Sequence, residues 1–205
     1  LIITISVLLI LVGVTILTRW FFLSKVVIGK IAPKRALIVL VSQGELKNIP
    51  ASEAIKFHYS PRKGNHTLEY CWLLRTPAPE EEPPKPSRSS WFNAQSIEKK
   101  YRGKVKMFQK SIEFDDPETS SIAVEQAVRE ARKFGIKPSD MVADVTGGTK
   151  MMSMGMVLAS IAAGIEMTYL KAKKTLPDGR VDPSGGSDPM RVDIEYYRRE
   201  NMQNE

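Results

Sequence analysis

A short glycine-containing run, from Asp144 to Lys150, constrains the fold of this chain more than any other feature of its sequence. It reads Asp-Val-Thr-Gly-Gly-Thr-Lys and separates a strand-like apolar run, residues 141–145, from a Met- and Ala-rich run of helical character, residues 151–165. A strand that breaks at two glycines and restarts as a helix is the junction where α/β folds bind phosphates. The glycines let backbone N–H groups approach an anion, the helix N-terminus adds partial positive charge, and Lys150 adds a full one.

This glycine run differs from two better-known phosphate-binding motifs. A P-loop needs a glycine five residues before Gly148 and a Lys-Ser or Lys-Thr pair after it, and the sequence has neither. A dinucleotide fingerprint, G-x-G-x-x-G after the first strand, is also missing from the sequence. ATP hydrolysis and NAD binding are therefore poorly supported. The structural alternative is that the two glycines only make a tight turn, with Thr149 as the helix cap.

Composition narrows the range of partners. The formal net charge is +7, and without Arg19, Lys25 and Lys30 the chain keeps 27 basic and 23 acidic residues, a net charge of +4. This mild excess fits an anionic ligand in a pocket better than a DNA-coating surface, so we expect no DNA partner. Cys71 is the only cysteine and the histidines are only two, which argues against a disulfide or a metal site. We expect no metal and no cofactor.

The first eighteen residues, Leu1 to Thr18, carry no charge. As a helix they would span ~27 Å, close to the hydrocarbon thickness of a bilayer. Aromatic residues follow at positions 20–22, where an interfacial belt is expected. Basic residues come next, with no acidic residue before Glu45: Arg19, Lys25, Lys30, Lys34 and Arg35.

This pattern predicts a single-pass inner (plasma) membrane protein with its N-terminus outside and its C-terminal domain in the cytoplasm, because positive flanks stay cytoplasmic. A cleaved signal peptide would instead need a basic region before the apolar core and small residues after it. Within the segment, Thr4, Thr15 and Thr18 fall within about 60° of one another on a helix. We expect this face to line a pore in an oligomer, although Ser and Thr can also simply bond their own backbone.

The rest of the chain alternates between strand and helix patterns, which predicts an α/β fold with a Rossmann-like, mostly parallel sheet and a C-terminal β-hairpin, preceded by the transmembrane helix. The expected strands are residues 36–41, 68–74, 105–114, 141–145, 167–172 and 192–197. The expected helices are residues 51–58, 92–101, 118–134 and 151–165. The expected organisation is a membrane segment and its flank at 1–28, a basic linker at 29–35, and a ligand-binding domain at 36–205.

Ligands of such sheets bind beyond the carboxyl ends of the strands. Two loops are expected at that edge, one after the strand at 36–41 and one after the strand at 141–145. The candidate ligand-binding residues are Ser42, Gln43, Gly44, Thr146, Gly147, Gly148, Thr149 and Lys150.

The sequence Asp144-x-Thr146-Gly147-Gly148-Thr149-Lys150-x-Met152, between a late strand and a long helix, resembles the signature of CARF domains (CRISPR-associated Rossmann fold). The resemblance covers roughly residues 34–200, and the first loop matches by position only. It implies a dimer that binds cyclic oligoadenylate made during phage infection. An N-terminal membrane helix followed by a lone CARF domain resembles the CARF-fused effectors of type III CRISPR systems that depolarise the host membrane.

From this resemblance we expect an antiviral receptor for cyclic tetra-adenylate, or another cyclic oligoadenylate, that associates as a dimer or tetramer in the lipid bilayer. Ligand binding would open a leak and arrest growth without enzymatic activity, so no catalytic residue is expected. The alternative is a membrane-tethered ring nuclease that cleaves the ligand through its ribose 2′-OH. A third possibility is a regulator that the helix only localises. Met151, Met152 and Met154 are expected to pack the helix against the sheet.

Overall fold

The computed structural model describes residues 22–59, 61–62, 65–79, 89–177, 182 and 185–198. The chain divides into two compact units. The larger unit is Gly29–Val192 and holds both predicted ligand loops. The described residues of the smaller unit are 22–28 and 193–198.

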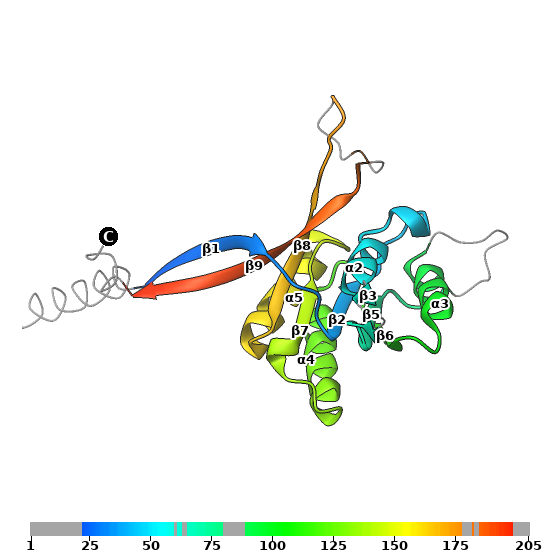
Figure 1. Cartoon of the computed structure of the whole chain (residues 1–205), viewed down its shortest axis with the longest axis horizontal. Helices are drawn as coiled ribbons and strands as arrows, with labels where there is room; N and C mark the ends of the chain where they lie inside the picture. Colours follow the sequence, from blue (N-terminus) through cyan, green and yellow to red (C-terminus); the bar gives the residue numbers. More distant parts are fainter. Residues whose placement is uncertain are drawn as a thin grey trace, which may run out of the picture. The chain divides into compact units, whose positions relative to one another are not determined.

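Seven strands form one sheet in the described part of the chain, in the order β1-β9-β8-β7-β2-β5-β6. β2 pairs in parallel with both β5 and β7, β5 pairs in parallel with β6, and β7 with β8, whereas β9 is antiparallel to β8. The prediction of an α/β fold with a mostly parallel sheet and a C-terminal hairpin is therefore confirmed (Figure 1). The strands are β1 Phe22–Lys30, β2 Ala36–Leu40, β5 Tyr70–Arg75, β6 Lys106–Ser111, β7 Met141–Asp144, β8 Glu166–Ala172 and β9 Ser187–Arg198.

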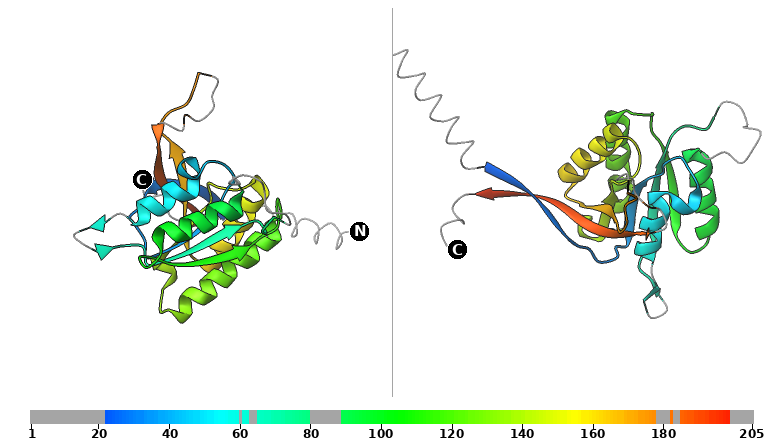
Figure 2. Two further views of the ribbon diagram at one scale, coloured as in Figure 1. Left: turned by 90° about the vertical axis from the view of Figure 1, so that its right-hand side faces the viewer. Right: turned by 90° about the horizontal axis from the view of Figure 1, so that it is seen from above.

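Helices cover both faces of the parallel strands in the larger unit (Figure 2). Helices α2 (Pro50–Tyr59) and α3 (Ser90–Tyr101) lie on one face, and α4 (Pro117–Lys133) and α5 (Lys150–Ala163) lie on the other. Short 3₁₀ turns, η1 (Leu46–Asn48) and η2 (Pro138–Asp140), precede α2 and β7. The result is a three-layer sandwich, the arrangement that right-handed crossovers between parallel strands produce.

The central strand β2 explains why the sequence shows a continuous apolar run there. Each of its five residues is fully buried, and alternate side chains enter two different cores. Ala36, Ile38 and Leu40 pack with residues of α4 and α5. Leu37 and Val39 pack with residues of α2 and α3. A strand that is covered on both faces has no solvent side, so every position is apolar.

Strand β1 was not expected. Residues 22–28 were assigned to the flank of a membrane segment and residues 29–35 to a linker, but Phe22–Lys30 is strand β1 and β9 is its neighbour in the sheet. Val26, Val27 and Ile28 are β-branched, which favours a strand once a partner strand is present. The assignment of 29–35 as a linker therefore needs correction at its start, where Gly29 and Lys30 belong to β1.

The end of that linker is also held in place. Lys34 Nζ lies 2.7 Å from Glu166 Oε1, and the Arg35 guanidinium donates to both carboxylate oxygens of Glu69 at 2.9 Å. The mutual hydrogen bonds raise the pKa of Arg35 and lower that of Glu69. A small antiparallel ladder, β3 (Pro61–Arg62) with β4 (Asn65–His66), was not expected either.

The predicted membrane segment Leu1 to Thr18, with the pore candidates Thr4, Thr15 and Thr18, lies outside the described residues. Among the described residues, no helix has both the length and the hydropathy that a membrane span requires.

Candidate functional site

The two predicted ligand loops follow neighbouring parallel strands. Ser42-Gln43-Gly44 comes after β2, and Thr146 to Lys150 comes after β7, which pairs with β2 from Ala36 opposite Met141 to Val39 opposite Asp144. Because the strands are parallel and adjacent, their carboxyl ends place both loops at the same edge of the sheet.

A cavity of about 280 Å³ lies between these loops. Four of the eight predicted residues line it: Ser42, Gln43, Gly148 and Thr149. Thr146 instead lines a second cavity of about 320 Å³, together with residues of η1, α2 and β8. A larger cavity of about 720 Å³ lies between α2 and α3 and contains none of the eight. The site is therefore built around the smallest of these three spaces.

Hydrogen bonds tie the start of the glycine loop to the neighbouring strand β8. Buried Asp144 accepts from the Thr146 backbone N–H at 3.2 Å and from the Thr168 hydroxyl at 3.0 Å. The Thr146 hydroxyl in turn accepts from the Leu170 backbone N–H at 2.8 Å. Thr146 thus holds the loop to the sheet, which is a structural role that we had not assigned to it.

The two glycines are needed for different reasons. Gly147 is buried, and a Cβ there would lie 2.6 Å from the carbonyl oxygen of Leu40 in β2. Gly148 is exposed and has a φ of +79°, a conformation that side chains with a Cβ rarely adopt. Gly147 therefore lets the loop pack on β2, and Gly148 lets the chain turn into α5.

The start of α5 is capped as the alternative hypothesis expected. The Thr149 hydroxyl accepts from the Met152 backbone N–H at 3.3 Å, and the Ser153 hydroxyl donates to the Gly147 carbonyl at 3.0 Å. Lys150 is exposed in the first turn. A capped turn and an anion site are compatible, because a single cap leaves other N–H groups of the first turn without helical partners.

The first loop is held from a distance, by a residue that sequence reasoning missed. Asn93 of α3 is 5% exposed, and its amide nitrogen donates to the carbonyls of Ser42 at 3.0 Å and Gly44 at 3.1 Å. Gly44 has a φ of +120°, which turns the chain toward η1. No local pattern marks Asn93, which lies on a helix of weak amphipathic character.

Hydroxyl groups form the side of the cavity next to α3. The Ser90 hydroxyl accepts from the Thr76 backbone N–H at 2.9 Å and lies 2.6 Å from the Thr76 hydroxyl. Both residues line the 280 Å³ cavity. The Ser89-Ser90 pair that starts α3 is a helix-start signal that could have pointed to them.

Only part of the expected packing of the methionines is observed. Met152 is 4% exposed and packs in the core, whereas Met151 and Met154 are 38% and 50% exposed. The prediction for Met151 and Met154 is wrong, because their positions on α5 face away from the sheet. One helix face can bury only residues spaced by three or four.

Burial changes the acid-base properties of several side chains. It raises the pKa of Asp144 to about 6, although the hydrogen bonds from Thr146 and Thr168 act in the opposite direction. It lowers the pKa of His58 to about 4, and the nearby charge of Lys34 contributes. Burial also raises the pKa of the Cys71 thiol, which keeps it protonated. In the described part of the chain, no group of three or more potential ligands could hold a metal ion.

No protein-family model matches the sequence, and no curated protein matches it either. Among solved structures, the chain is similar to a type III CRISPR defence DNA nuclease activated by cyclic oligoadenylate. The TM-score is 0.46 at 18% identity, over 78% of this chain and 22% of that one.

It is also similar to Can2 from Sulfobacillus thermosulfidooxidans in complex with cyclic tetra-adenylate, with a TM-score of 0.47 and 14% identity over 76% of this chain and 37% of that one. A third structure is Csm6 from Enterococcus italicus bound to cyclic hexa-2′-fluoro-hexa-dAMP. Its TM-score is 0.46 at 15% identity, over 73% of this chain and 36% of that one. This chain therefore spans only 22% to 37% of the length of these chains.

One expectation needs correction after these comparisons. From the sequence we expected no enzymatic activity, but the first of the similar structures is that of a DNA nuclease. The expectation of a protein without catalysis is therefore withdrawn.

Proposed function

We propose that this chain is a receptor for a cyclic oligoadenylate, with cyclic tetra-adenylate as the first candidate. The observation that supports it most is that the loops after β2 and β7 line one cavity, beside the N-terminus of α5. The resemblance of residues 144–152 to the CARF signature is the reason for choosing cyclic oligoadenylates as the ligand class. The proposal includes a role in antiviral defence.

The chemistry of the site suits a ring of phosphates and bases. Backbone N–H groups at the start of α5 and the ammonium group of Lys150 would contact phosphate oxygens. The Gln43 amide can both donate to and accept from a base edge or a ribose hydroxyl. A two-fold dimer would present two copies of this site to one cyclic ligand.

Self-association has support on the exposed face of α5. Met151, Met154, Leu158 and Ile161 are between 37% and 60% exposed, and their spacing places them on one side of the helix. Lys150 starts the same helix. An apolar stripe next to the ligand loop suits an interface that a bridging ligand would strengthen.

We also propose that residues 1–18 anchor the chain in the inner membrane as a single span, with the C-terminal domain in the cytoplasm. The uncharged run and the basic residues after it support this orientation. Ligand binding would shift an oligomer toward a state that leaks ions and depolarises the membrane, which requires different affinities for the two states.

Calorimetry with cyclic tri-, tetra- and hexa-adenylate on the full chain in detergent tests the receptor proposal. Lys150→Ala should weaken binding of the preferred ring by roughly 10- to 150-fold, because a charged phosphate contact contributes about 1.5–3 kcal/mol. Lys133→Ala, an exposed lysine at the end of α4, is the matched control and should bind like the wild type. Equal binding by all three proteins would place the ligand elsewhere.

The same samples decide between binding and cleavage. Chromatography of the ligand after incubation should return the intact ring if the domain only senses it. Linear fragments would instead make the domain a ring nuclease, the alternative drawn from the sequence.

The membrane proposal needs a test in cells that produce the ligand. A voltage-sensitive dye should report depolarisation with the full chain and none with residues 22–205, a truncation that keeps strand β1 intact. Growth arrest by the truncated chain would place the toxic activity in the domain itself.

A further inference from the structure

Phe114 is the most exposed large apolar side chain in the described part of the protein, at 67%. It follows β6 and lines the same cavity as the two ligand loops. An aromatic ring that is open to water contributes little to the core. Its position at the cavity therefore needs an explanation other than packing.

The chain on both sides of Phe114 is fixed. Asp115 has a φ of +59° and is the only non-glycine residue with a positive φ among the described residues. Asp116 caps α4 by accepting from the Glu118 backbone N–H at 2.8 Å. On the other side, the Ile112 backbone N–H donates to the backbone carbonyl oxygen of Arg75 at 2.9 Å, and Ile112 is buried. A left-handed conformation is uncommon for a residue with a Cβ, and such strained positions cluster at active sites and ligand-binding segments.

The other walls of the cavity supply what a nucleobase requires. Met152 gives an apolar floor, and it is 4% exposed. The exposed Gln43 amide and the hydroxyl pair of Thr76 and Ser90 give donors and acceptors. A volume of about 280 Å³ suits one base, and not a whole cyclic ligand. An aromatic wall, an apolar floor and a few polar groups are the usual composition of a base pocket.

We propose that Phe114 stacks on one adenine base of the cyclic ligand and that this cavity is the base subsite. The inference rests on the proposed function and deepens it. The phosphates would lie on the glycine loop and Lys150, while one base enters the cavity with Gln43 at its edge. Stacking on an aromatic ring tolerates any base, so Phe114 provides affinity and Gln43 provides selectivity.

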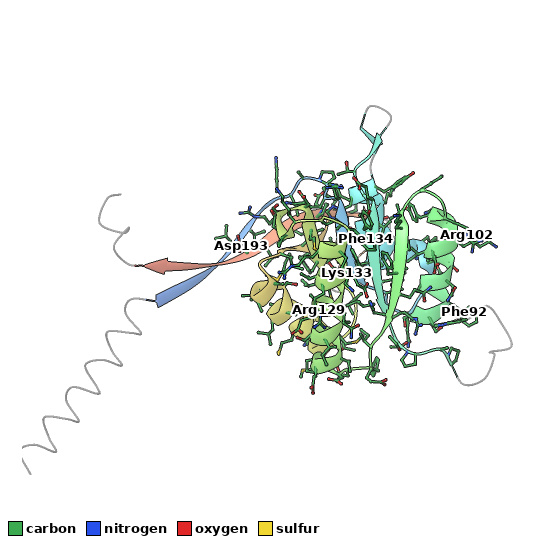
Figure 3. The ribbon with its side chains drawn as sticks, turned by 90° about the horizontal axis from the view of Figure 1, so that it is seen from below. Phe92, Arg102, Arg129, Lys133, Phe134 and Asp193 are labelled. Carbon is green, nitrogen blue, oxygen red and sulfur yellow. The ribbon has the colours of Figure 1, made fainter. Side chains whose placement is uncertain are left out.

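The test is a binding titration of the full chain in detergent with cyclic tetra-adenylate. Phe114→Ala and Phe114→Leu should both weaken binding by about 5- to 150-fold, the factor expected for the loss of one stacked base. Phe114→Trp should bind within a few fold of the wild type, and adenine stacking should quench its fluorescence. Phe134→Ala is the matched control, since Phe134 is 41% exposed at the far end of α4 (Figure 3) and does not line the cavity.

The leucine and tryptophan variants keep the inference testable if the alanine variant does not fold. If the wild type binds, Lys150→Ala weakens binding and Phe114→Leu binds like the wild type, the base subsite is wrong and the receptor proposal stands. If the wild type binds no cyclic oligoadenylate, both proposals fail. A Phe134→Ala variant that keeps the thermal stability of the wild type and binds as poorly as Phe114→Ala would also overturn the inference.

Discussion

The glycine loop and the first-strand loop line the same cavity, but local residues contribute much more to holding the first of them. The glycine loop is fixed by residues within a few positions of it, Asp144, Thr149 and Ser153, and by the neighbouring strand β8. The first-strand loop is fixed by Asn93, which is 51 positions away from Ser42. A loop with local supports leaves a motif in the sequence, whereas a loop held across the fold leaves almost none.

The largest expected loss of stability comes from a substitution that disrupts only the glycine loop. In Gly147→Ala the added Cβ would meet the Leu40 carbonyl oxygen at 2.6 Å, so the loop must leave β2. We expect a loss of about 2–4 kcal/mol in the free energy of unfolding, or a fall of about 5–15 °C in Tm.

Gly164→Ala is the control for that variant, because Gly164 ends the same helix with a φ of +66° and no heavy atom lies near its Cβ position. It should cost only about 1 kcal/mol. Equal losses for the two variants in thermal unfolding would mean that contact with Leu40 does not hold the loop.

The next effect depends on pH. The pKa of Asp144 in the folded protein, about 6, lies above its ordinary value of 3.8, so the folded state binds the proton more tightly. Stability from this group is complete below pH 3.8 and is lost as pH rises through 6, by about 3 kcal/mol in total. Asp144→Asn keeps an oxygen acceptor for the Thr146 backbone N–H, and it should remove the fall in stability with rising pH.

The measurement for Asp144 is the difference in unfolding free energy between the variant and the wild type from pH 4 to pH 7. His58 also titrates in this range, since burial lowers its pKa to about 4, but its contribution cancels between the two proteins. A difference that stays constant with pH would refute the role of the buried carboxyl group.

A smaller effect is expected at the support of the first loop. Asn93→Ala leaves the carbonyls of Ser42 and Gly44 without their donor, which should cost about 1–3 kcal/mol at any pH between 4 and 7. Asn48→Ala loses an exposed hydrogen bond to Glu45 and should change stability by less than about 0.5 kcal/mol. Urea unfolding of both variants compares their free energies of unfolding. Similar losses for the two variants would mean that the Asn93 hydrogen bonds do not stabilise the first loop.

The smallest effect compares the helix caps next to the two loops. Thr149 caps α5 and Ser89 caps α3, with cap distances of 3.3 Å and 3.4 Å. Each alanine variant should lose about 1 kcal/mol of stability. Only Thr149→Ala should also weaken binding of the cyclic ligand, because Thr149 lines the cavity and Ser89 does not. Equal ligand binding by both variants would limit Thr149 to its capping role.

Much of the larger unit was predictable from local patterns. The apolar runs at 36–41 and 141–145 predicted buried parallel strands, because a strand that is covered on both faces must be apolar throughout. Gly135, which has a positive φ, directly follows the predicted helix at 118–134, whereas the predicted helix at 151–165 runs past Gly164, the residue with a positive φ that ends α5. Strand β1 was missed because its residues follow an uncharged run that predicts a membrane segment, and its partner β9 is more than 150 positions away.

The sequence by itself determined the α/β alternation, the place of each loop directly after its own strand and the capped turn into α5, because each depends on residues within a few positions. Only the tertiary structure decided that Thr146 is bonded to β8, that Asn93 holds the first loop and that Phe114 lines the same cavity. These contacts join residues from separate strands and helices. Their existence depends on how the layers pack, and local patterns do not record it.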